Sequence, residues 1–130
     1  MPLARIDLVQ GKPAAFRRAV GEVIYDAMVK ELKAPVDDRF QVITEHPPEN
    51  HIADEGYLGI RRTTDCIIIQ LYLLAGRTVE QKRSFYKAVA DGLHECLGHR
   101  REDVFIGLVE VSRENWSFGN GEAQYAMPGV

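Results

Sequence analysis

The sequence has few cysteines and no long apolar segment. Its two cysteines, Cys66 and Cys96, stand in apolar stretches without the spacing of metal ligands, so we expect both to be reduced and buried. The longest apolar run, CIIIQLYLLAG, is too short to span a bilayer, and the chain starts with neither a basic leader nor an apolar signal core. We therefore expect a cytoplasmic protein without a membrane segment.

Neither acidic nor basic residues strongly predominate. The formal net charge is -3, with acidic and basic residues interspersed, which gives no electrostatic reason to expect nucleic acid or an anionic membrane as a partner. The histidines of HPPENH, His46 and His51, lack the geometry of a metal site, and the glycines of FGNGEAQY lack the context of a dinucleotide fingerprint. With 130 residues, of which 45% are hydrophobic, the chain has the size of one domain, 1–130.

The chain aligns with itself at a fixed offset of 65 residues. The segment DRFQVITE, which begins at Asp38, falls on DVFIGLVE, which begins at Asp103, and upstream LVQGK falls on LLAGR. Apolar positions between these segments coincide at the same offset. Agreement over three segments predicts an internal pseudo-repeat, at about 2–65 and 66–130.

The first half has the pattern strand, helix, strand. Residues 3–9 predict a strand, and a helix begins at Pro13, which is well tolerated at a helix start. Apolar residues then recur at helical spacing up to about Lys33, and a second strand follows at 40–45.

The second half repeats this order. Residues 66–74 are apolar and rich in strand-forming residues, and Thr78 with Gln81 predicts a capping box. The helix runs to Gly98, and a last strand is expected at 104–111.

A long connection that contains a helix joins parallel strands, so each half is expected to be a β-α-β unit. Together they predict an α/β fold, α+β in some schemes, with a four-stranded sheet and both helices on one face. The strand CIIIQLYLL is apolar at nearly every position, which is typical of burial on both sides. We expect other copies of the chain to cover the second face in a compact homo-oligomer.

Two segments stand apart from these units. Residues 47–65 are turn-rich and leave room for a short hairpin, and the tail from Trp116 onward is expected to be an extended arm able to add strands to a neighbour.

A proline directly follows the initiator methionine. Pro2 is tolerated at the first residue of a strand because it lacks the N–H that a ladder would use, which is one explanation. The other is that Met1 is removed, as is common before a small residue. Pro2 would then carry a free, titratable secondary amine at the tip of the strand.

These residues resemble the tautomerase superfamily, whose members use an amino-terminal proline as their catalytic group. The resemblance is strongest to the malonate semialdehyde decarboxylase branch and lies in Pro2, IYDAMV, PVDDRFQ, GRTVEQKRSFY and ENWSFGNGEAQY. It implies a homotrimer with active sites near subunit boundaries, a small carboxylic acid as substrate, and no metal or cofactor.

The resemblance also implies roles for five residues. Pro2 matches the catalytic amine, Asp38 the carboxylate that positions or activates water, and Arg77 one of two arginines that hold the substrate carboxylate. Trp116 and Phe118 match residues that wall the pocket, although packing of an oligomer seam would also explain them.

Two of these assignments have alternatives. Asp38 coincides with Asp103 at the repeat offset, which favours a shared structural role before each strand. The decarboxylases carry Arg-Pro-Arg where this chain has Ala75-Gly76-Arg77, so their other arginine is absent. A carboxylate is held best by a bidentate fork, so this difference places decarboxylation in question. Arg61 or Arg62 is a candidate replacement.

The charge of Pro2 decides between mechanisms. An α-amino group has a pKa of about 7.7 to 8.0; burial and Arg77 would lower it, whereas Asp38 would raise it. A neutral amine is a general base and predicts keto-enol tautomerisation of a 2-oxo acid, the leading hypothesis. A cationic amine predicts a decarboxylase or hydratase acting on a 3-oxo acid such as malonate semialdehyde. A non-catalytic trimer that binds a small ligand or a protein is the alternative of another class.

Overall fold

The computed structural model describes residues 2–128. Strand β1 (Leu3–Val9), helix α1 (Ala14–Leu32) and strand β2 (Phe40–His46) form the first β-α-β unit. Strand β3 (Ile67–Leu74), helix α2 (Val79–Leu97) and strand β4 (Val104–Val111) form the second. The predicted strands and helices are confirmed, with ends that differ by one residue at most.

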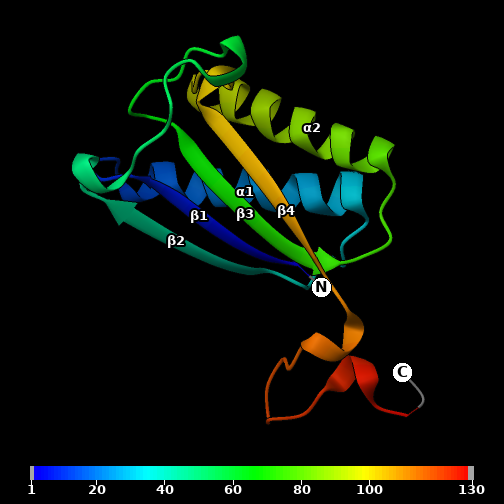
Figure 1. Ribbon diagram of the computed structural model, residues 1–130. Helices are drawn as coiled ribbons and strands as arrows, with labels where there is room; N and C mark the ends of the chain where they lie inside the picture. The colour runs from blue at the N-terminus through cyan, green and yellow to red at the C-terminus, as the bar shows by residue number, and fades with distance from the viewer. Residues whose placement is uncertain (1, 129–130) are drawn as a thin grey trace.

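The four strands form one mixed sheet in the order β2-β1-β3-β4. Each unit contributes a parallel pair, and the two units join through the antiparallel pairing of β1 with β3 at the centre. Both helices lie behind this sheet in the view of Figure 1, side by side on one face. The predicted α/β fold, with two β-α-β units and both helices on one face, is confirmed.

Local sequence signals explain where the helices begin and end. Pro13 is the N-cap of α1, and α2 begins with the predicted capping box, in which the Thr78 side chain accepts from the Gln81 backbone N–H and the Gln81 side chain accepts from that of Thr78. Gly98 ends α2 in the left-handed conformation at φ 64°. Lys33 ends α1 in the same conformation, at φ 58°, although it carries a side chain.

The core lies between the sheet and the helices. Alternate residues of β1 and β3 point to the helices and are fully buried there, as expected for period-two alternation in strands. Helices α1 and α2 pack against them with apolar residues at helical spacing. The largest buried side chains are Ile6, Val20, Ile24, Met28, Leu32, Ile67, Ile69, Leu71, Leu73, Phe85, Val89 and Leu93.

The face of the sheet away from the helices is uncovered in one chain and carries apolar residues on both edge strands, with Arg5 and Gln70 between them. Phe40 and Val42 on β2 and Phe105 and Val109 on β4 are 48%, 42%, 49% and 41% exposed. The strand register places these residues beside outward-facing positions of β1 and β3, because neighbours in register share a face. We call this surface the free sheet face.

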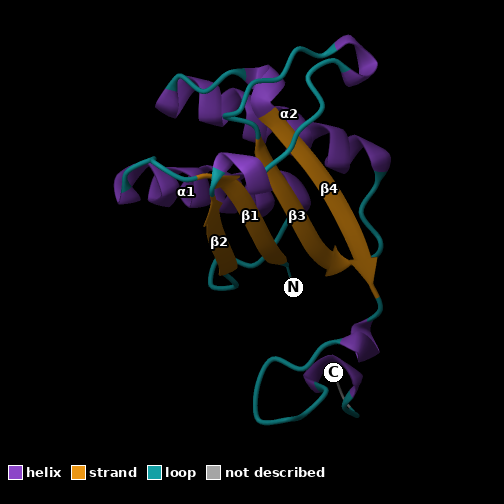
Figure 2. Ribbon diagram, turned by 60° about the vertical axis from the view of Figure 1, so that its left-hand side comes forward, coloured by secondary structure: helices purple, strands orange, loops and turns teal. Residues whose placement is uncertain are grey.

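The tail and the connection between the units lie at opposite ends of the sheet (Figures 1 and 2). The tail leaves the end of β4 and contains two 3-10 turns, Arg113–Asn115 and Gln124–Ala126. The addition of its strands to a neighbouring copy stays a prediction. Residues 47–65 also form 3-10 turns, and no hairpin occurs in this part of the described chain.

Two further expectations from the sequence were tested. Cys66 is buried as predicted, but Cys96 is exposed, because it lies on the outer side of the last turn of α2. Both thiols are free. Within residues 2–128, no helix is both long enough and apolar enough to cross a membrane.

Candidate active site

Pro2 lies in a pocket at the end of the sheet where β1 and β2 begin. The pocket has a volume of about 200 Å³ and is lined by Pro2, Leu3, Phe40, Trp116, Ser117 and Phe118. Leu3 and Phe40 are neighbours in the parallel register of β1 with β2, so two adjacent strand starts form its floor. The tail supplies the other wall. Pro2 itself is buried.

The tail is held in shape by its own aromatic side chains. The rings of Trp116 and Phe118 are stacked at a centroid distance of 5.5 Å, and Tyr125 meets Phe118 edge-on at 4.8 Å. The Gln124 side chain accepts from the Phe118 backbone N–H and donates to the Gly119 carbonyl. The indole nitrogen of Trp116 is buried and has no acceptor among the described residues.

Asp38 lies on the segment that joins α1 to β2, two residues before Phe40, and is only 4% exposed. Burial raises the pKa of its carboxyl, the positive charge of the chain's amino terminus opposes that rise, and Asp37 reinforces it. The segment is fixed from both sides: the Tyr25 hydroxyl donates to the Val36 carbonyl, and Arg39 pairs with Glu22 at 2.8 Å.

Arg77 leaves the end of β3 at the same end of the sheet, but it lines a different hollow. That hollow, of about 330 Å³, is lined by Leu32, Lys33, Ala75, Gly76, Arg77 and Gln81. The guanidinium donates from Nε to the Leu32 carbonyl and from Nη1 to the Leu74 carbonyl, both at 3.1 Å. Two of its five N–H donors are therefore used, and Nη2 has no acceptor among the described residues.

The candidate replacements for the missing arginine lie elsewhere in the chain. Arg62 lines a pocket at the opposite end of the sheet and donates to three carbonyls of the connection, those of Asp54, Tyr57 and Ile60. The carbonyl of Arg61 accepts from Arg100 in the same region. Within one chain, neither arginine lies in the Pro2 pocket.

The structure thus brings Pro2, Trp116 and Phe118 into one pocket. Asp38 is buried two residues before Phe40, and Arg77 lines a separate hollow at the same end of the sheet. Sequence reasoning missed Lys33, which shares the hollow with Arg77 as a second cation. Its position directly after a helix, where glycine is usual, was the available signal. Ser117 was also missed, because nothing in its local sequence distinguishes it.

Comparison with known proteins agrees with this arrangement. Two family models, both described as tautomerase enzyme, match the chain, one over residues 38–119 and the other over residues 2–59. The probable tautomerase YusQ of Bacillus subtilis is 40% identical over 95% of this chain and 98% of its own length.

Two solved structures extend the comparison. FG41 malonate semialdehyde decarboxylase inhibited by 3-bromopropiolate has a TM-score of 0.88 and 39% identity, and the match covers 97% of this chain and 99% of that one. A fused 4-OT wild-type symmetric trimer has a TM-score of 0.77 and 25% identity, with 95% of this chain and 98% of that one covered. The chain therefore belongs to the tautomerase family and is an enzyme with catalysis of the tautomerase type.

Proposed function

We propose that the enzyme moves a proton between oxygen and carbon of a small 2-oxo carboxylic acid, with the amine of Pro2 as the acid-base group after removal of Met1. The observation that carries the proposal is the burial of Pro2 between Leu3, Phe40, Trp116 and Phe118. Apolar walls disfavour the charged form of an amine, so they favour a neutral base in this pocket.

The proton transfer is balanced within the substrate. The Pro2 nitrogen accepts the proton of the enol hydroxyl, and the electron pair of that O–H bond forms the C=O bond. The electron pair of the C=C bond then takes a proton from the Pro2 ammonium to form the new C–H bond. A positioned base of this kind accelerates the reaction by about 10²- to 10⁴-fold, and the enzyme returns to its starting protonation state.

Two groups support the placement of a carboxylate-bearing substrate. The buried indole N–H of Trp116, which has no acceptor among the described residues, can donate to a substrate oxygen in the pocket. Arg77 retains unused N–H donors and lies at the same end of the sheet, so it is our candidate for the carboxylate. Lys33 adds a second positive charge to the same hollow.

Decarboxylation of a 3-oxo acid is the second candidate, favoured by one observation. Asp38 is buried and lies two residues before Phe40, which lines the Pro2 pocket. A carboxylate in that position stabilises a cationic amine, which would polarise a carbonyl instead of removing a proton. The solved structure that is 39% identical is of a malonate semialdehyde decarboxylase, which agrees with this alternative.

We further propose that the active molecule is a homotrimer. The apolar free sheet face is a surface that monomeric proteins rarely leave uncovered. A related solved structure is a symmetric trimer of a fused chain. In such an assembly, neighbouring copies would cover this face and stand close to the Pro2 pocket, since Phe40 belongs to both surfaces.

The first experiment tests the amine. Intact mass measurement on the purified protein shows whether Met1 is absent, and turnover is then measured with phenylpyruvate enol and with malonate semialdehyde. We expect Pro2→Ala to lower the preferred activity by about 10²-fold or more, with Pro13→Ala, at the exposed start of α1, as the matched control. A variant with a glutamate inserted between Met1 and Pro2 keeps the nitrogen in a peptide bond and should be inactive.

The outcomes separate the candidates. Turnover of phenylpyruvate enol that increases with pH, as the Pro2 ammonium loses its proton, supports tautomerisation. Turnover of the semialdehyde alone would show that the enzyme is a decarboxylase instead. Equal activity of Pro2→Ala and the native enzyme on both compounds would remove Pro2 from the mechanism.

A further inference from the structure

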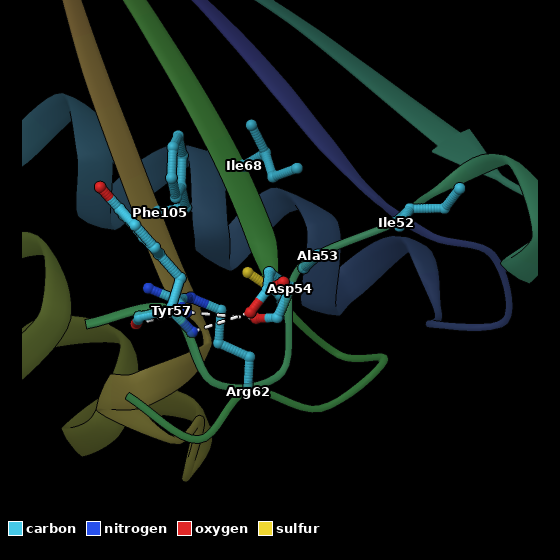
Figure 3. Close-up of a pocket in the computed structure, with 8 residues that line it drawn as sticks. Ile52, Ala53, Asp54, Tyr57, Arg62, Ile68 and Phe105 are labelled. Atoms are coloured by element: carbon cyan, nitrogen blue, oxygen red, sulfur yellow. Dashed lines mark hydrogen bonds between the residues drawn. The ribbon is translucent and has the colours of Figure 1, made fainter. Parts of the chain in front are cut away.

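A second apolar cavity lies at the other end of the sheet from Pro2. It has a volume of about 240 Å³ and is lined by Ile52, Ala53, Asp54, Tyr57, Arg62, Cys66, Ile68 and Phe105. Figure 3 shows Phe105 and Ile68 standing on β4 and β3, with Tyr57, Asp54 and Arg62 on the connection beside them. Nothing in the proposed reaction uses this cavity.

The cavity corresponds to the Pro2 pocket at the offset of 65 residues. That offset carries Leu3 onto Ile68 and Phe40 onto Phe105, and Ile68 and Phe105 are neighbours in the parallel register of β3 with β4 as Leu3 and Phe40 are in that of β1 with β2. Both pairs form the floor of their cavity.

The covering segments correspond as well. The same offset carries Ile52 onto Ser117 and Ala53 onto Phe118, so the connection covers one floor as the tail covers the other. Asp38 and Asp103 also correspond at this offset, each two residues before its phenylalanine and each buried. The two ends of the sheet therefore present the same cavity twice.

The decisive difference is at the position of the amine. The offset places Pro2 on Ile67, which is the first residue of β3 and is joined to Cys66 by a peptide bond. An interior peptide nitrogen cannot accept a proton at neutral pH, and burial raises the pKa of the Cys66 thiol, so that group is not a reactive thiolate. The second cavity has walls for a ligand without a group for proton transfer.

Arg62 gives the cavity a polar recognition group. All three of its hydrogen bonds leave from Nη1, to the carbonyls of Asp54, Tyr57 and Ile60 at 3.1 to 3.3 Å. Nε and Nη2, which form one edge of the guanidinium, have no acceptor among the described residues. Such an edge matches the two oxygens of a carboxylate. The carbonyl bonds hold the guanidinium in place before a ligand arrives.

Asp54 is the competing charge at the cavity and restricts where an anion can sit. Its Oδ1 accepts from the backbone N–H groups of Gly56 and Tyr57 at 2.9 and 2.8 Å, and these bonds, with the charge of Arg62, lower the pKa of its carboxyl. The carboxylate is therefore already engaged by the loop. A ligand anion is expected on the free edge of Arg62, with its apolar part on Ile68 and Phe105.

We propose that this cavity is a second, non-catalytic binding site for a small carboxylate with an aromatic or branched apolar group. A cavity of this size with apolar walls and one oriented cation suits a single ring and its carboxylate. The site binds molecules of the same chemical class as the Pro2 pocket but leaves them unconverted. The proposal does not depend on proton transfer by Pro2.

Phenylacetate is a suitable probe, and the experiment measures how many molecules of it bind to each chain of the intact protein. Isothermal titration should give two molecules per chain, and Trp116, the single tryptophan, reports only on the Pro2 pocket through its fluorescence. The Arg62→Gln variant should bind only one phenylacetate molecule per chain, or bind the second with an affinity lowered by about tenfold or more. Its fluorescence response should be unchanged. Arg61→Gln removes the same charge one residue away from the cavity and should keep both molecules.

Replacement of Arg62 can also disturb the connection, because its side chain donates to three carbonyls there. A second variant controls for this effect. Ile68→Phe leaves those bonds intact and adds bulk to the floor, and it should abolish the same binding event. Crystals soaked with phenylacetate should show its carboxylate on Nε and Nη2 of Arg62. One molecule per chain in the native protein, or two molecules in both Arg62→Gln and Ile68→Phe, would overturn the proposal.

Discussion

In the proposed mechanism, Pro2 and Asp38 would act on one another through opposite preferences for charge. The pocket disfavours a charged amine, and burial disfavours a charged carboxyl, but each charge would stabilise the other. The protonation of either group is therefore a property of the pair. If the two groups form such a pair, a small change at the pocket would shift the enzyme between base and acid chemistry.

Asp38→Asn is expected to make the protein more stable at neutral pH. The pKa of Asp38 is raised in the folded protein, mainly by burial, from its ordinary value of 3.8. Its contribution to stability is therefore complete below 3.8 and is lost as the pH rises through the raised value. Removal of the ionisable group should abolish that loss while it changes the pH dependence of turnover.

Urea denaturation at pH 3 to 8 tests this expectation, with Asp26→Asn on the exposed side of α1 as the control. The stability gain should appear only in the upper part of the range. A loss of stability for Asp38→Asn at pH 7 would mean that its charge stabilises the fold instead.

Some candidate site residues can be found from the sequence alone, whereas the direction of their side chains cannot. Pro2 is found from its place in the sequence, because a chain has one amino terminus. The direction of the Arg77 side chain is set by the carbonyls of Leu32 and Leu74, which come from two different elements, and no local pattern encodes that contact. The same is true of the connection that carries Arg62 over β3 and β4.

At the scale of the elements, the end of α1 carries strain that glycine would relieve. Lys33 adopts φ 58°, a conformation that costs a residue with a side chain about 1 kcal/mol. Lys33→Gly should raise the free energy of unfolding by about 0.5 to 1 kcal/mol, although it removes the bond from Nζ to the Lys30 carbonyl.

Lys30→Gly is the matched comparison, because Lys30 lies inside the last turn of the same helix. Glycine there should destabilise by about 1 kcal/mol. Thermal and urea unfolding of both variants gives the measurement, and a destabilised Lys33→Gly would show that the side chain of Lys33 contributes more than its backbone costs.

The connection between the units is anchored to β4 by one buried carboxylate. Asp103 accepts from the Thr63 hydroxyl at 2.5 Å and from the Thr63 backbone N–H at 2.7 Å, and Arg100 pairs with it at 3.1 Å. Burial acts to raise the pKa of Asp103, but these hydrogen bonds outweigh it, so the pKa lies below 3.8. This contribution to stability is present above 3.8 and is lost as the pH falls through the lowered value.

Asp103→Asn should therefore destabilise the protein by about 2 kcal/mol at pH 7, with a smaller difference in acid. Hydrogen exchange should show the change first in residues 60–66. Asp65→Asn, which loses only an exposed pair with Lys12, should cost less than about 1 kcal/mol. Equal effects of the two variants would contradict the anchoring role.

For the whole molecule, the free sheet face is the feature with the largest expected consequence. A charge at Val109, which is 41% exposed in one chain, would be buried without a partner in the proposed trimer. Val109→Asp should shift the assembly to monomers at micromolar concentration, as measured by light scattering after size exclusion.

Val79→Asp is the control, because Val79 is 62% exposed and starts α2 on the helical side of the sheet. An aspartate in the first turn of a helix is favourable, so the trimer should persist. A native protein that elutes as a monomer, or a Val109→Asp variant with unchanged mass, would contradict the proposed assembly.

The sequence predicted the fold closely because its signals are local and agree with one another. The Thr78 capping box, the left-handed Gly98 and the alternation of β1 each specify an element without reference to the rest. The packing of the tail could not be predicted in the same way, because Trp116, Phe118 and Tyr125 contact one another along a path that no local pattern specifies. Its strand pairing with a neighbouring copy stays a prediction.

The strand order also determines how this protein reaches its native state. Every strand pairing joins residues that are distant in the sequence, such as Leu3 with Phe40 and Ile6 with Ile69. No pair of strands in this sheet can therefore form early as a β-hairpin. Chains with mainly non-local pairings fold slowly, over milliseconds to about a second. Until then the apolar segment 67–74 is open to encounters with other chains. Refolding yield should consequently fall as protein concentration rises.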